Sequence, residues 1–66
     1  MINVNMLKSE VVKNGMTQKD FCNSIGMSQS TFIRKMKRGV FKTDEIEKMI
    51  NVLKLEKPQQ IFFGMD

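Results

Sequence analysis

Apolar residues recur along this chain at intervals of three and four, the spacing of one face of an α-helix. The longest such stripe follows the i, i+3, i+4, i+7 pattern and consists of Ile46, Met49, Ile50 and Leu53. No stretch alternates strictly between apolar and polar, as a half-buried β-strand would. Because the chain has 66 residues, the pattern predicts a single domain over residues 1–66, which is all-α, compact and built from five short helices.

Capping residues and glycines predict where these helices begin and end. The first helix is expected from about Asn5 to Asn14, followed by Gly15 in a left-handed conformation. Thr17 is a suitable N-cap for the second helix, which Gly26 should end in a turn that requires positive φ.

Similar residues delimit the rest of the chain. Ser28 can cap a third helix that ends at Gly39, and Thr43 can cap a fourth. Pro58 suits the first position of a short fifth helix, because its missing N–H has no partner there in any case.

Large apolar residues spaced four apart predict the buried faces of the first three helices. These pairs are Leu7 and Val11, Phe21 and Ile25, and Phe32 and Met36. A domain of this size buries only about 60% of the surface of its unfolded chain, so the core should be small. Cys22 is the one cysteine, which excludes an internal disulfide, and its spacing predicts a buried packing role.

The consecutive residues Ile61, Phe62 and Phe63 cannot all be buried by one short helix. We therefore expect at least one of them to be exposed and this end of the chain to contribute to self-association. The alternative is that the three residues close the base of the core against Leu7 and Leu53.

Positive charge is concentrated in the middle of the chain. Residues 17–42 contain six lysines and arginines and one acid, whereas the whole chain has a net charge of +4. The remaining segments together are slightly acidic. This distribution predicts a local positive potential, which favours a polyanionic partner.

The third predicted helix carries polar and basic residues on the side opposite its apolar stripe. A helical projection places Arg34 opposite Phe32 and Met36. Gln29 lies in the first turn, where a helix end can meet base edges. Glutamine can bond adenine N6 and N7, arginine can bond guanine O6 and N7, and serine can serve either base. The pattern indicates a helix that enters the major groove of DNA.

We expect Gln29, Ser30 and Arg34 to contact bases. Phosphate contacts are expected from the polar and basic side chains around them, namely Gln18, Ser28, Thr31, Lys35, Lys37, Arg38 and Lys42. For Ser28, helix capping is the first expected role. Ile33 is open to two interpretations, because it can pack in the core or touch a thymine methyl group.

Several segments resemble the helix-turn-helix of the Cro-type, or XRE-like, repressors, and in particular its small phage-encoded members. The resemblance covers nearly the whole chain, from Leu7 to Phe63. The matching segments are Gln18–Cys22, Ile25–Phe32, Lys37–Phe41, Asp44–Lys48 and Ile61–Phe63.

This resemblance implies a five-helix domain that binds operator DNA as a homodimer, with the helix at residues 28–38 facing the bases. A phage or prophage repressor without an effector domain would act by occupying the operator and blocking polymerase. The chain departs from the family pattern at Cys22, where alanine is usual, and at Lys35, where the family is often apolar.

Other classes of function are disfavoured by what the sequence lacks. The chain has no histidine, so neither a Ser-His or Cys-His pair nor a zinc site is expected. We expect no enzymatic activity, cofactor, metal or small-molecule ligand. No secretion signal and no apolar run of membrane-spanning length is visible, which predicts a cytoplasmic location in a bacterial host cell and no membrane partner.

One alternative function remains open, a co-regulator that binds a partner repressor and touches DNA weakly. The apolar C-terminal residues favour it, and the central positive charge argues against it.

Overall fold

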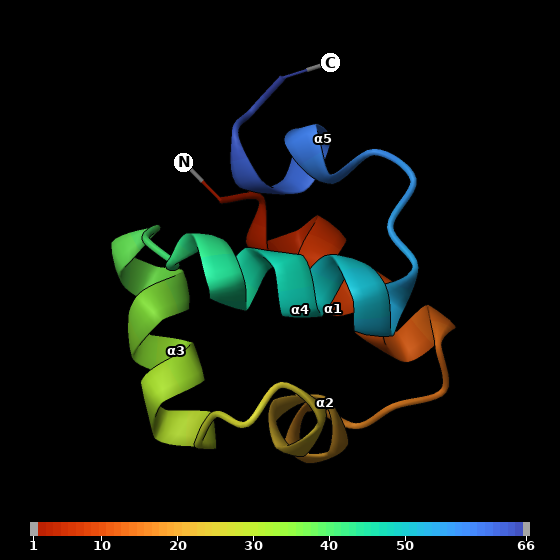
Figure 1. Cartoon of the computed structure of the whole chain (residues 1–66), viewed down its shortest axis with the longest axis vertical. Helices are drawn as coiled ribbons and strands as arrows, with labels where there is room; N and C mark the ends of the chain where they lie inside the picture. Colours follow the sequence, from red (N-terminus) through yellow and green to blue (C-terminus); the bar gives the residue numbers. More distant parts are fainter. Residues whose placement is uncertain (1, 66) are drawn as a thin grey trace.

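The structure is a computed structural model that describes residues 2–65. These residues form five α-helices and no strand, which confirms the predicted all-α class. The helices are α1 (Val4–Lys13), α2 (Gln18–Ser24), α3 (Gln29–Arg38), α4 (Thr43–Leu53) and α5 (Pro58–Phe62). In Figure 1, α2 lies at one end of the molecule, α3 stands at one side, and α5 lies at the end opposite α2.

Side-chain caps fix the starts of α2 and α3 as predicted. The Thr17 hydroxyl accepts a hydrogen bond from the Asp20 N–H at 3.1 Å, and the Asp20 carboxylate accepts one from the Thr17 N–H at 3.3 Å. This reciprocal pair is a capping box. Hydrogen bonding to Thr17 also lowers the pKa of the Asp20 carboxyl, because it favours the charged form. At α3, the Ser28 hydroxyl accepts from the Thr31 N–H at 3.2 Å.

Two helices begin differently from the prediction. Helix α1 starts one residue early, because the Asn3 side chain accepts a hydrogen bond from the Met6 N–H at 3.0 Å and caps the helix. In α4, Thr43 is the first helical residue rather than the N-cap. The cap position belongs to Lys42, whose backbone N–H donates to Glu45 Oε1 at 2.8 Å. Glu45, at the third helical position, thus reaches back to the cap residue, whereas no N-cap side chain accepts from the first N–H groups of α4.

The turn between α2 and α3 depends on Gly26. Its φ is +69°, in the left-handed region that costs a residue with a Cβ about 1–2 kcal/mol. The next residue, Met27, donates its N–H to the Cys22 carbonyl at 2.9 Å, which satisfies one of the free carbonyls at the end of α2. The predicted tight turn at Gly26 is confirmed.

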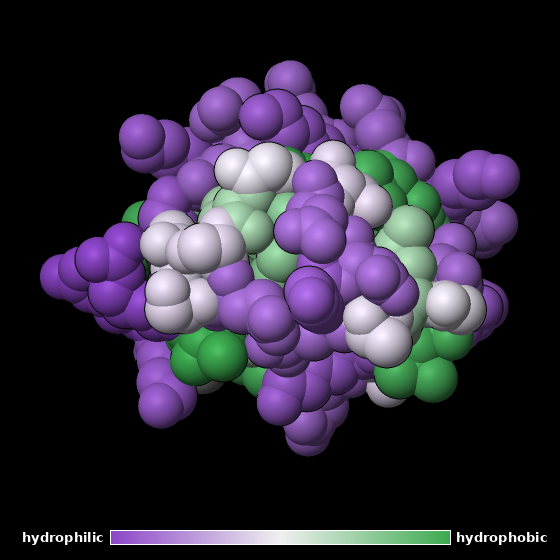
Figure 2. Space-filling view, turned by 90° about the horizontal axis from the view of Figure 1, so that it is seen from below, coloured by the Kyte–Doolittle hydropathy of each residue, from purple (hydrophilic) through white to green (hydrophobic). Residues whose placement is uncertain are grey.

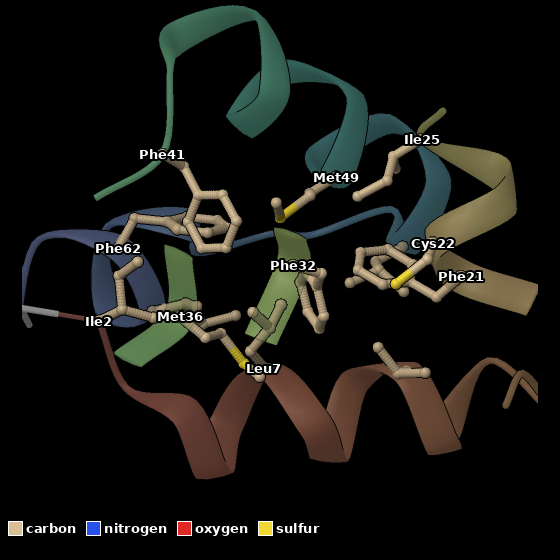
Figure 3. Packing of buried hydrophobic residues seen from close by; sticks show 13 residues of the cluster. Ile2, Leu7, Phe21, Cys22, Ile25, Phe32, Met36, Phe41, Met49 and Phe62 are labelled. Carbon is tan, nitrogen blue, oxygen red and sulfur yellow. The ribbon is translucent and has the colours of Figure 1, made fainter. Parts of the chain in front are cut away.

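A single apolar cluster lies between α1 and α4 and extends to α5 (Figure 3). It includes all three pairs predicted from the spacing, together with Cys22, Met49 and Leu53. Its phenylalanine rings form a continuous row: the centroid distances are 5.6 Å between Phe21 and Phe32, 5.8 Å between Phe32 and Phe41, and 6.4 Å between Phe41 and Phe62. Phe41 was not predicted to be buried, since it lies outside any helix.

The C-terminal apolar residues divide between core and surface. Ile61 and Phe62 are buried, whereas Phe63 is 60% exposed. The Asn3 N–H donates to the Ile61 carbonyl at 2.7 Å and ties α5 to the segment before α1. The expectation of one exposed residue is confirmed. Ile61 and Phe62 are covered by the core of their own chain, so the predicted dimer contact through this segment stays a prediction that falls mainly on Phe63.

Candidate nucleic-acid interface

Helices α2 and α3 cross instead of running side by side, as Figure 1 shows with α2 viewed near its axis and α3 in the plane. Phe21 and Phe32 meet edge to face at the crossing, with 76° between their ring planes. Cys22 is buried beside them and adds little bulk. These contacts leave the opposite side of α3 uncovered by the rest of the chain.

The outward face of α3 carries the residues predicted to read bases. Gln29, Ser30 and Arg34 are all exposed, as are Lys37 and Arg38. On the other side, Phe32 and Met36 are buried. The structure therefore confirms that this helix has one apolar face and one polar face.

Ile33 lies on the outer side of α3 and is 37% exposed. Of its two interpretations, the structure supports the outward one. The side chain is next to Arg34 in the sequence and one helical turn from Ser30 and Gln29. An apolar group is thus available among the polar ones on this face.

The hydroxyl groups at the start of α3 form hydrogen bonds with one another. Besides its bond to the Thr31 N–H, the Ser28 hydroxyl donates to Thr31 Oγ1 at 2.9 Å and lies 3.4 Å from Ser30 Oγ. Thr31 is half-buried, whereas Ser28 is exposed. A phosphate bond from Ser28 or Thr31 would therefore compete with the cap, while Ser30 has the weaker internal contact.

A basic hollow lies between the C-terminal half of α3 and the loop that follows it. It is lined by Arg34, Lys35, Arg38, Val40 and Lys42. Val40 is 67% exposed, so its side chain contributes an apolar patch surrounded by cationic groups. The side chains of α3 and the α3–α4 loop thus meet in one concavity, which sequence spacing did not reveal.

Lys35 is not a free cation, so the phosphate contact predicted for it would require breaking an ion pair. Its ammonium group forms a salt bridge of 2.5 Å with Glu45 Oε2, and the two side chains are only 21% and 14% exposed. Burial by itself would raise the pKa of Glu45, but the hydrogen bonds from Lys35 and from the Lys42 N–H outweigh it and lower the pKa. Lys35 therefore joins α3 to α4 at a mostly covered position on the edge of this hollow.

Glu45 was not singled out for the candidate site. A signal for it was present, because an acid three residues after a helix start is the spacing of a capping box. Its second contact, to a lysine ten residues earlier, depends on the path of the α3–α4 loop and has no local signature.

Gln18 begins α2 and is half-buried. It lines a small, largely apolar hollow between the end of α1 and the start of α2, together with Lys8, Val11, Val12, Met16, Thr17 and Phe32. The end of the molecule that carries α2 presents a mainly hydrophilic surface, with smaller apolar areas toward its edges (Figure 2).

Comparison with known proteins gives no relative: no family model, curated protein or solved structure matches the chain. Within residues 2–65, no helix combines the length and the apolar character needed to span a bilayer. A five-helix, all-α domain with an exposed polar and cationic helix is therefore the class that the structure defines.

Proposed function

We propose that the protein is a sequence-specific DNA-binding regulator of transcription that reads operator DNA with α3, the second helix of a helix-turn-helix. The supporting observation is the exposed face of α3, where Gln29, Ser30 and Arg34 are all accessible. The same helix is anchored from behind by Phe32 and Met36. A helix held in this way can enter a groove without loss of core contacts.

Base recognition in this proposal uses three kinds of group. Gln29 bonds adenine and Arg34 bonds guanine in a bidentate manner, and Ser30 contacts either base. Ile33 supplies an apolar surface for the methyl group of a thymine. Each good bidentate pair discriminates against a wrong base by about 1–3 kcal/mol.

Phosphate contacts come from the edges of this face. Lys37, Arg38 and Lys42 are exposed and basic, and Gln18 stands at the start of α2. Such contacts fix the register of the protein on the duplex and make affinity depend on salt, with little regard to sequence.

Repression by occupancy is the mode of action in this proposal, because a domain bound to the operator would block access of the polymerase. A phage or prophage repressor of Cro type, acting in the bacterial cytoplasm, fits this proposal. As a C₂ dimer it would place two α3 helices about 34 Å apart, on half-sites one turn of DNA apart. Phe63, exposed and apolar, is the residue of the C-terminal segment that remains available for such a dimer.

Selection of bound sequences from random double-stranded DNA tests the proposal. We expect a recurrent site, and a palindrome if the protein binds as a dimer. The recovered site is then titrated against a scrambled duplex of equal composition, with Gln29→Ala and Arg34→Ala as variants that remove base contacts. Absence of enrichment, or equal affinity for the scrambled duplex, would overturn the proposed function.

A second candidate is a co-regulator that docks on a partner repressor. The observation in its favour is the exposure of Phe63 and Met65, at 60% and 61%. Tight binding of operator DNA by the isolated chain would argue against it, because a co-regulator would need its partner to be retained on DNA.

A further inference from the structure

We propose that Glu45 determines the specificity of DNA binding by holding Lys35 away from the phosphates. In this role the Glu45 carboxylate keeps the Lys35 ammonium group in an ion pair, so that this cation is not available to DNA. The inference rests on the proposed function and deepens it, because it concerns the balance between cognate and random DNA. The starting observation is that Lys35 both lines the basic hollow and bonds Glu45.

Only some of the cationic groups that line the basic hollow are available to a ligand. Arg34, Arg38 and Lys42 line it together with Lys35. Among residues 2–65, the Lys35–Glu45 pair is the one ion pair that the structure contains. The other three cations therefore face the hollow without a carboxylate, whereas the charge of Lys35 is already balanced.

Glu45 is held firmly in its place. Oε1 accepts from the Lys42 N–H at 2.8 Å while Oε2 bonds the Lys35 ammonium. Both side chains are mostly covered. If Lys35 swung out to a phosphate, a mostly covered carboxylate would lose its ion-pair partner and keep only the hydrogen bond from the Lys42 N–H, which is unfavourable. Lys35 consequently stays with Glu45 when DNA is present.

Removing the negative charge of Glu45 frees Lys35. The lysine side chain is long and flexible, so it can reach an anion on the same concave surface. Each additional lysine that neutralises a phosphate raises the salt slope of binding by about 0.9. Phosphate contacts carry no sequence information, so affinity for random DNA rises and the ratio of cognate to random affinity falls.

The test is a salt titration of cognate and random duplexes with Glu45→Gln. Glutamine keeps an oxygen that can accept from the Lys42 N–H, so the start of α4 is preserved. We expect the slope of log K against log salt to steepen by about 0.9, which means roughly a 3.5-fold greater loss of affinity between 50 and 200 mM salt. Asp44→Asn is the matched control, because Asp44 is exposed and one residue away. It removes the same charge without releasing Lys35.

A second variant keeps the inference testable if Glu45→Gln is unstable. Lys35→Gln in the otherwise unaltered chain is expected to leave the salt slope unchanged, because Lys35 contacts no phosphate. In the Glu45→Gln background it should restore the original slope. Equal slopes for Glu45→Gln and Asp44→Asn, or a lower slope for Lys35→Gln alone, would overturn the inference while DNA binding itself stands. Failure of the unaltered chain to bind any duplex would instead overturn the proposed function.

Discussion

Phe21 and Phe32 meet edge to face with their ring centroids 5.6 Å apart, and this contact sets how α3 lies across α2. Both rings are almost completely buried. Aromatic pairs in this geometry contribute about 0.5–1.5 kcal/mol beyond the burial of their surface. The orientation of the candidate interface therefore depends on two side chains that cannot touch DNA themselves.

The turn that joins these helices can be tested at Gly26. A Cβ added there meets no atom within 4 Å, so Gly26→Ala should cost only the backbone penalty of about 1–2 kcal/mol. For a domain of this size, each kcal/mol lowers Tm by about 4–8 °C. Thermal unfolding followed by circular dichroism measures the loss. Gly26→Asn should lose less, since asparagine tolerates the left-handed region; equal losses would contradict this explanation.

Arg34→Ala is expected to relax specificity at one base pair. The loss should be about 1–3 kcal/mol on the cognate site and much smaller on duplexes altered at that pair. Titration of the variant against a set of single-base substitutions locates the affected position. A uniform loss on every duplex would assign Arg34 to a phosphate instead of a base.

Lys42→Ala should weaken binding to all sequences alike and reduce the salt slope by about one. Lys57→Ala serves as the control, because Lys57 is exposed and lies in the α4–α5 connection, across the molecule from α3 in Figure 1. Binding titrations at several salt concentrations measure both slopes. An unchanged slope for Lys42→Ala would remove that residue from the phosphate contacts.

Glu45 should make the fold sensitive to acid. Its pKa is lower in the folded chain, so its charged form stabilises the fold above about pH 4.3, the usual pKa of a glutamate. This stabilisation is lost as the pH falls through the lowered value. Asp20, whose pKa is also lowered, acts in the same direction. Urea unfolding between about pH 3 and pH 6 should therefore show a shallower decline for Glu45→Gln, but not a flat one. An unaltered decline would show that the pair with Lys35 adds nothing.

Phe63→Ser tests self-association. If copies of the chain pair through this residue, sedimentation should show a shift toward monomer, with stability changed by less than about 0.5 kcal/mol because the side chain is exposed. Val12→Ser is a matched control, since Val12 is also exposed but lies on α1. The same shift in both variants would show that general surface hydrophobicity, not Phe63, drives association.

Local signals predicted most of this fold. Thr17, Ser28 and Gly26 mark helix ends through their own chemistry, and residues four apart mark buried faces, so neither needs knowledge of distant parts of the chain. Phe41 and the Lys35–Glu45 pair were missed for the opposite reason. Their environment is created by the α3–α4 loop, whose path depends on the packed core. At the candidate interface, the exposed face of α3 could be predicted. Which of its cations is paired with a carboxylate could not.

The row of phenylalanine rings bears on how the chain folds during its synthesis. Phe41 rests against Phe62, and the Ile61 carbonyl is bonded to the Asn3 N–H near the opposite end of the sequence. So small a core has little apolar surface to spare. A nascent chain that has been translated only through α4 would leave one end of this row open to water, and the domain should close only after Phe62 has emerged from the ribosome.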